Sequence, residues 1–208
     1  MWIVKLGGSL LGSPELSLWL DLFACHGDGN IVIVPGGGIF ADAVRESQKL
    51  NGSSDAVAHR MAVMAMDQYG VLMAGLNPAL VTAESELEIA ERSWQHRAIV
   101  WLPSAMVNAD ENIPKNWQVT SDSLAVWLAT KLNAEHLILV KSKKPKIDQI
   151  SIERLMKDGI VDGHFGDFAV GQNFSTWILG KQNHTAFSNG FSQENLAVIG
   201  LPVRCAWN

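Results

Sequence analysis

Two short apolar runs near the start of the chain each end in glycine. The first covers residues 2–6 and contains one lysine, Lys5; the second is Ile31–Val34. A short apolar run closed by glycine predicts a strand that is buried on both faces. Apolar residues at helical spacing follow each run and predict helices. The two glycine bends consist of Gly7, Gly8 and Ser9 after the first run, and of Gly36, Gly37 and Gly38 after the second.

The alternation of strand and helix patterns continues to residue 141. Strands that alternate with helices predict an α/β fold with a mainly parallel sheet. Helices are predicted over 14–26, from 39, over 55–76, from 85, and from 121 with Ser121 as its cap. Further strands are predicted over 80–82, 98–102 and 136–140. Beyond residue 141 the pattern is weaker and predicts a helix over 151–157 and strands over 176–179 and 196–199.

The composition narrows the class of protein. The 208 residues are 48% hydrophobic and carry a net charge of −5, which suits one domain with a large core. This charge argues against a nucleic-acid partner bound by a basic surface. Cys25 and Cys205 lie far apart without a Cys-x-x-Cys motif, so we expect reduced thiols and no metal site. The chain has no apolar span of membrane length, and we expect a cytoplasmic protein with no membrane partner.

Lys5 is the first candidate for chemistry. A buried ammonium group is unfavourable unless an anion lies beside it. The glycines that follow offer backbone N–H groups that suit phosphate oxygens. Both glycine bends follow the carboxyl ends of predicted parallel strands, so both lie on the rim where open α/β sheets bind ligands. The pattern therefore predicts a site for two phosphate-bearing groups.

Three further motifs each have a functional interpretation and a purely structural or weaker one. Gly36–Gly38 fits the loose dinucleotide pattern G-x-G-x-x-A, but no strand ending in an acid follows its helix. This absence weighs against an NAD(P)-dependent oxidoreductase, which stays an alternative. Asp122 in the first turn of its predicted helix can simply complement the helix dipole. The lysine run at 141–146 is either a solvated loop or part of a nucleotide site.

The ordered set of motifs resembles the amino acid kinase family over nearly the whole chain. The motifs are Lys-x-Gly-Gly-Ser at 5–9, Pro-Gly-Gly-Gly at 35–38, Ser-Asp-Ser-Leu-Ala at 121–125, and the closing residues Asn189-Gly190, Glu194-Asn195-Leu196 and Gly200. The resemblance implies a single domain over 1–208, folded as a three-layer α/β/α sandwich around a mostly parallel sheet. It also implies that a lobe of about 1–118 binds the phosphoryl acceptor and a lobe of about 119–208 binds ATP.

Within this family, the segments 35–45 and 58–70 are similar to the small kinases of methanofuran biosynthesis, which act on an aminomethylfuran-methyl phosphate. This similarity implies a role in methanofuran-linked C1 metabolism, with an acceptor that is itself a phosphate monoester. Family members commonly have a Thr-Asp-Val-Asp-Gly turn where this chain has Lys-Ser-Lys-Lys-Pro at 141–145. That departure raises one alternative, a nucleotide-binding regulatory relative without kinase activity.

The resemblance also implies roles for individual residues. Lys5 would neutralise charge on the transferred phosphoryl group, and Asp122 would orient Lys5 and a second lysine. Lys141 and Lys143 are the two candidates for that second lysine. Mg²⁺ would accompany ATP, held mostly by phosphate oxygens and water. The nucleotide phosphates would be held by Gly7, Gly8 and Ser9, and the acceptor side by Gly36, Gly37 and Gly38.

Three basic residues follow the second glycine bend. Arg45, His59 and Arg60 are candidates to bind a phosphate or carboxylate of the acceptor. Surface charge on amphipathic helices explains each of them equally well. The predicted helix at 55–76 is apolar on several sides, so it is either central in the fold or packed on a second subunit. A homodimer is therefore expected.

Overall fold

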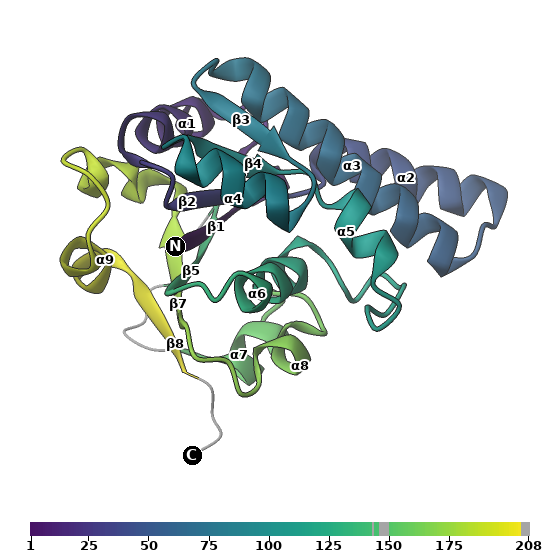
Figure 1. The fold of residues 1–208 in the computed structure, drawn as a ribbon. Coiled ribbons are helices and arrows are strands. Elements are labelled where there is room, and N and C mark those ends of the chain that lie inside the picture. Colours follow the sequence, from purple (N-terminus) through teal and green to yellow (C-terminus); the bar gives the residue numbers. More distant parts are fainter. Residues whose placement is uncertain (143, 146–149, 205–208) are drawn as a thin grey trace.

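The computed structural model describes residues 1–142, 144–145 and 150–204. Its strands form one eight-stranded sheet in the order β3-β4-β2-β1-β5-β7-β8-β6 (Figure 1). Paired strands run parallel except for β7 and β8, which are antiparallel. The strands are β1 (Trp2–Leu6), β2 (Ile31–Pro35), β3 (Leu80–Ala83), β4 (Ala98–Trp101), β5 (His136–Lys141), β6 (Ile150–Ser151), β7 (Ser175–Gly180) and β8 (Leu201–Arg204).

β1 lies inside the sheet, with β2 on one side and β5 on the other. Successive side chains of a strand point to opposite faces. Ile3 and its register partner Leu137 join one core cluster, whereas Val4 and its partner Ile138 join another. Both faces of the sheet are therefore buried, which explains why these strands are apolar at nearly every position.

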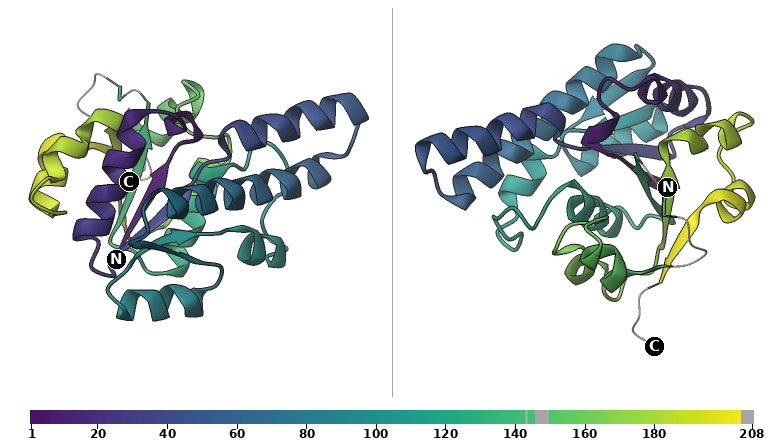
Figure 2. Two further views of the ribbon diagram at one scale, coloured as in Figure 1. Left: turned by 90° about the horizontal axis from the view of Figure 1, so that it is seen from above. Right: turned by 180° about the vertical axis from the view of Figure 1, so that it is seen from behind.

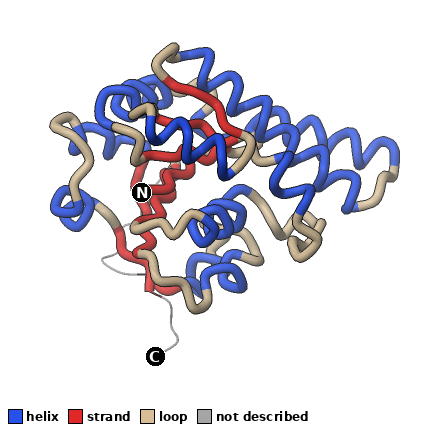
Figure 3. Tube along the Cα trace, viewed as in Figure 1, coloured by secondary structure: helices blue, strands red, loops and turns tan. Residues whose placement is uncertain are grey.

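Helices cover both faces of the sheet (Figures 2 and 3). One core cluster contains side chains of α4 to α8, and the other contains side chains of α1, α9 and the C-terminal half of α3. This arrangement is the predicted α/β/α sandwich. The helices are α1 (Pro14–His26), α2 (Gly38–Asn51), α3 (Asp55–Leu76), α4 (Glu86–Trp94), α5 (Ser104–Ala109), α6 (Ser121–Lys131), α7 (Ile152–Lys157), α8 (Phe165–Ala169) and α9 (Gln193–Ile199), with 3₁₀ turns η1 (Gly8–Leu10) and η2 (Lys181–Phe187).

Helices α2 and α3 form a hairpin that extends beyond the sheet (Figure 2). Gly52 ends α2 in the left-handed region, with a φ of 63°. Ser54 then caps α3, because its side chain accepts a hydrogen bond from the Val57 N–H. The hairpin has a small apolar cluster of its own, which consists of Ala41, Val44, Ala58 and Ala65.

Most of the predicted elements are confirmed, and α3 has the predicted bounds. The strand predicted over 196–199 is wrong, because these residues end helix α9 and the strand β8 follows them. Ser192 caps α9 by accepting a hydrogen bond from the Asn195 N–H. A four-residue apolar run is too short for its period to separate a strand from a helix. Helices α5 and α8 and strand β6 have no counterpart in the sequence prediction.

The predicted lobe boundary near residue 118 lies between β4 and β5 in the sequence. The sheet nevertheless runs through both halves, since β1 pairs directly with β5. The assignment of acceptor and nucleotide to these halves stays a prediction. In the part of the chain that the structure describes, no helix combines the length and apolar character needed to cross a bilayer.

Leu137 on β5 provides a test of where the core lies. Its side chain is fully buried, so Leu137→Ala should lower the free energy of unfolding by about 3 kcal/mol through lost apolar contact and a residual cavity. Leu87→Ala on α4 is the matched control, since Leu87 is 79% exposed and should change stability by less than about 0.5 kcal/mol. Urea unfolding of both variants measures the difference, and equal losses would contradict this placement of the core.

Candidate functional site

The two glycine bends are in direct contact. β1 and β2 are parallel with Leu6 opposite Pro35, so the bends that follow them meet at one rim of the sheet. The N–H of Gly36 donates to the carbonyl of Leu6 at 2.9 Å. A Cβ at Gly8 would lie 2.3 Å from the backbone nitrogen of Gly38, and one at Gly36 would lie 2.4 Å from that of Gly8. Only glycine permits this approach of the two backbones.

A buried carboxylate links two lysines beside these bends. Asp122 Oδ1 lies 2.9 Å from Lys5 Nζ, and Lys141 Nζ lies 2.8 and 2.7 Å from the two carboxylate oxygens of Asp122. Lys5 faces Leu139 across β1 and β5. Lys141 is two residues further along β5, so it points to the same face as Lys5. Helix α6 covers that face and brings Asp122 between the two ammonium groups.

The cluster carries two ammonium groups against one carboxylate. Lys5 and Asp122 are only 5% and 6% exposed, so solvent screens these charges weakly. Burial alone would raise the pKa of Asp122, but the charges of Lys5 and Lys141 outweigh it and hold the pKa below its usual value. Burial, with repulsion from Lys5, lowers the pKa of Lys141 to about 8. The excess positive charge makes this place attractive to an anion.

Asp162 holds the start of α6 in position. Its carboxylate accepts hydrogen bonds from the Thr120 N–H at 2.9 Å, the Thr120 hydroxyl at 2.7 Å and the Ser123 N–H at 3.0 Å, and also from the Ser123 hydroxyl. The expectation that Ser121 caps this helix is wrong. Thr120 is the N-cap residue and Ser121 begins the helix, because Asp162 satisfies the free N–H groups from outside.

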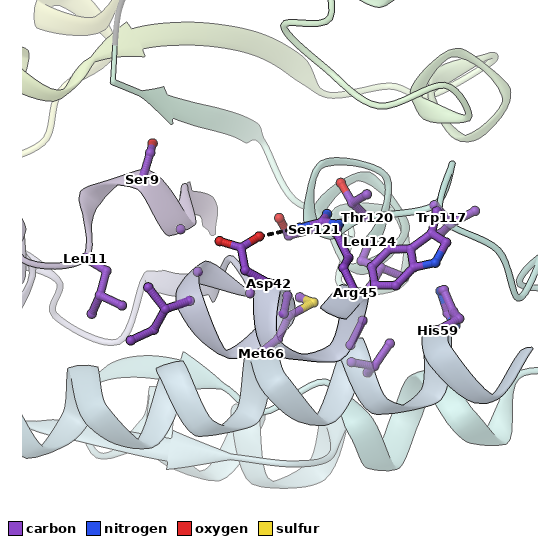
Figure 4. Close-up of a pocket in the computed structure, with 18 residues that line it drawn as sticks. Ser9, Leu11, Asp42, Arg45, His59, Met66, Trp117, Thr120, Ser121 and Leu124 are labelled. Atoms are coloured by element: carbon purple, nitrogen blue, oxygen red, sulfur yellow. Dashed lines mark hydrogen bonds and ion pairs between the residues drawn. The ribbon is translucent and has the colours of Figure 1, made fainter. Parts of the chain in front are cut away.

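A cavity of about 490 Å³ opens beside the glycine bends (Figure 4). Figure 4 shows Ser9 and Leu11 at one end and Trp117 and His59 at the other. Its lining consists of Gly8, Ser9, Leu11, Gly37, Gly38, Ile39, Ala41, Asp42, Arg45, His59, Ala62, Val63, Met66, Trp117, Val119, Thr120, Ser121 and Leu124. The cavity thus collects residues of both glycine bends, the α2–α3 hairpin and the start of α6.

The basic candidates after the second bend fall in different places. Arg45 lines the cavity, donates to Asp42 at 2.7 Å and lies 4.7 Å from the ring centre of Trp117. His59 also lines the cavity and is buried. Arg60 is exposed on α3 and is not among the described residues that line the cavity. Lys143 lies outside the described residues.

Sequence reasoning missed three contributors to this region. Trp117 and Asp42 line the cavity, and Asp162 binds the start of α6. Trp117 lies in an irregular segment without a motif. Asp162 is about forty positions away in the sequence from the helix that it binds. No local sequence pattern could therefore identify either residue. Within the described residues, no three His, Cys, Asp or Glu side chains gather in a group that could hold a metal ion.

Residues 1–145 match the sequence model of the amino acid kinase family. This chain belongs to the amino acid kinase family. Its order of motifs and its sandwich fold agree with that membership. The match includes Lys5, both glycine bends, Asp122 and Lys141, so the contacts described above lie within the matched part.

Individual relatives extend the comparison. The chain is similar to the [5-(aminomethyl)furan-3-yl]methyl phosphate kinase of Methanocaldococcus jannaschii, with 29% identity over 140 residues. This match covers 67% of the chain and 64% of the relative, which is less than two thirds of the relative's length.

Two solved structures have the same fold as this chain. The uridylate kinase of Archaeoglobus fulgidus matches with a TM-score of 0.68 at 17% identity, over 98% of this chain and 99% of that one. The UMP kinase of Bacillus anthracis matches with a TM-score of 0.67 at 13% identity, over 99% and 96% of the two chains. Identities this low establish a common fold, and they carry no information about the acceptor.

The role of Asp162 is testable through stability. Asp162→Ala leaves the Thr120 and Ser123 N–H groups without their partner, so the free energy of unfolding should fall by about 2 kcal/mol. Asp167→Ala is the control, since Asp167 is exposed and contacts His164 near the surface; its loss should stay below about 0.5 kcal/mol. Urea unfolding distinguishes the two, and similar losses would argue against Asp162 as the cap of α6.

Proposed function

We propose that this family member is an ATP-dependent phosphotransferase that moves the γ-phosphoryl group to a small-molecule acceptor. The observation that carries the proposal is the Lys5–Asp122–Lys141 cluster beside two interlocked glycine bends. The cluster places an excess positive charge beside two backbone segments suited to phosphate. Charge stabilisation of this kind is the main requirement of phosphoryl transfer.

The first glycine bend is the proposed place of the nucleotide phosphates. Gly7 and Gly8 lead into η1, and N–H groups at the start of a helical turn have no partner within that turn. Lys141 lies on the β5 side of the same rim. Mg²⁺, bound mainly by phosphate oxygens and water, would supply further charge neutralisation.

The cavity is the proposed acceptor site. Gly37 and Gly38 at the start of α2 and Ser121 at the start of α6 line it together. The N-terminus of α2 attracts a phosphate group through its free N–H groups and partial positive charge. Arg45 lines the cavity further along, beside Trp117, where its charge is paired with that of Asp42. An acceptor with a phosphate group therefore suits the end of the cavity at the second glycine bend.

The proposed acceptor is [5-(aminomethyl)furan-3-yl]methyl phosphate, the compound on which the archaeal relative acts. The cavity volume suits a small ligand. Val63, Met66 and Leu124 supply an apolar middle section for a five-membered ring. Transfer to the phosphate of this compound yields a diphosphate and ADP. The protein would then act in methanofuran-linked C1 metabolism.

In this mechanism Lys5 and Lys141 stabilise the negative charge that builds up during an in-line transfer. Asp122 holds both ammonium groups at fixed positions, which limits the reorganisation needed during reaction. The backbone N–H groups of the two bends position donor and acceptor on opposite sides of Lys5. No covalent intermediate with the protein is required.

Two alternatives receive less support from the geometry. A nucleotide-binding relative without activity is suggested by the unusual turn after β5, yet that strand still supplies Lys141 to Asp122. An NAD(P)-dependent oxidoreductase needs an open second glycine loop for a dinucleotide, whereas Gly36 and Gly38 are packed against Gly8.

The proposed assembly is a homodimer that packs through α3. Val57, Met64 and Val71 are half-exposed apolar residues on this helix. Apolar side chains that recur along one exposed helix are typical of a subunit contact. A cytoplasmic location accords with the proposed use of ATP.

The activity itself is the first test. The protein with MgATP and the proposed acceptor should release ADP and form the diphosphate, detected by a coupled assay and by ³¹P NMR. Lys5→Met removes the charge but keeps the apolar stem, and kcat should fall by about 10²–10³-fold. Lys49→Met, on the exposed end of α2, is the matched control and should retain activity. An unimpaired Lys5→Met enzyme would refute the mechanism, and absence of turnover with this acceptor would refute its identity.

The pH dependence tests the charge of Lys141. Its pKa is lowered to about 8 in the free protein, and the proposed role needs the protonated form. The kcat/KM for ATP should therefore fall about tenfold per pH unit above pH 8, since deprotonation removes the positive charge. Lys141→Arg stays charged and should remove this alkaline limb, even if its maximum rate is lower. An unchanged alkaline limb in Lys141→Arg would assign the ionisation to another group.

A further inference from the structure

His59 is a buried polar side chain without a partner. It lies on α3, is only 3% exposed and lines the cavity. Within the described part of the chain, its Nε2 atom has no hydrogen bond. A buried nitrogen without a partner is unfavourable by about 1–3 kcal/mol and is rare in native structures. A ligand in the cavity would supply the missing partner.

The protonation state of the His59 imidazole restricts which chemical group of a ligand can bind to it. Burial and, to a smaller extent, the charge of Lys115 lower the pKa of His59. The ring is therefore neutral at neutral pH, with one nitrogen as a donor and the other as an acceptor. A neutral ring is a weak ligand for phosphate, so the expectation that His59 supplies a cation is not supported. The proposed phosphate site lies instead at the start of α2.

The position of His59 indicates which part of the acceptor it meets. Figure 4 shows His59 and Trp117 at the end of the cavity away from Ser9 and the glycine bends. Two other polar groups at that end are already engaged. The indole N–H of Trp117 donates to Gln48 at 2.6 Å, and Arg45 donates to Asp42. An acceptor with its phosphate at the glycine bends would bring its opposite end to His59.

We propose that His59 is the specificity residue for a primary amine at the end of the acceptor remote from its phosphate. This inference rests on the proposed acceptor site. Nε2 accepts a hydrogen bond from an N–H of the amine when the neutral ring carries its proton on Nδ1. The apolar residues between the two ends hold the ring of the acceptor. Phosphate monoesters without the amine leave Nε2 unpaired and are therefore selected against.

The test compares two acceptors in two proteins. With the aminomethyl acceptor, His59→Leu should lower kcat/KM about 10- to 100-fold, mainly through KM for the acceptor, while KM for ATP stays unchanged. With furan-3-ylmethyl phosphate, which lacks the aminomethyl arm, wild type and His59→Leu should agree within about twofold. His59→Gln keeps an acceptor oxygen and should recover part of the loss. Gln68→Leu, on the exposed face of α3, is the matched control and should behave as wild type.

Measurements of thermal stability and of acceptor binding separate a specificity role of His59 from a structural one. Leu at this buried position removes an unpaired polar atom, so the Tm of His59→Leu should not fall. Calorimetric titration without ATP measures the affinity for the aminomethyl acceptor. It therefore tests the preference for the amine even when no turnover occurs. Failure of wild type to turn over would reject the proposed function, whereas a His59-dependent preference for the amine in binding would still support this inference. Equal losses with both acceptors, or a lower Tm with a raised KM for ATP, would overturn it.

Discussion

The buried contact of Lys5 and Lys141 with Asp122 constrains the rest of the structure. Two ammonium groups on adjacent strands of a covered sheet face are tolerated only because a carboxylate lies between them. That carboxylate comes from α6, so the helix must be positioned accurately against β1 and β5. Asp162 contributes to this positioning from a segment much later in the chain. The site thus depends on a tertiary arrangement of four separate segments.

The first turn of α6 serves both parts of the site. Asp122 points to the lysines, while Thr120 and Ser121 line the cavity. A shift of this turn would therefore move the charge cluster and the cavity wall together. The glycine bends are coupled in the same way, because a side chain at Gly8 would clash with the backbone of Gly38, and one at Gly36 would clash with the backbone of Gly8. The two bends, where donor and acceptor are proposed to bind, are therefore parts of one rim of the sheet.

The sequence predicts those features that depend on local pattern. The bounds of α3 follow from its Ser54 cap and its long apolar periodicity, and the requirement for an anion near Lys5 follows from burial alone. The strand predicted over 196–199 fails because four apolar residues fit either period, and the Ser192 cap decides for a helix. The contacts of Asp162 and Trp117 arise from folding of distant segments, which no local pattern encodes.

The outer strand β3 has only four residues. This margin of the sheet therefore offers few free backbone N–H and C=O groups to another molecule. Long flat margins are templates for the growth of fibrils by strand addition, and short ones protect against it. The β3 margin is consequently a poor template for that route of polymerisation.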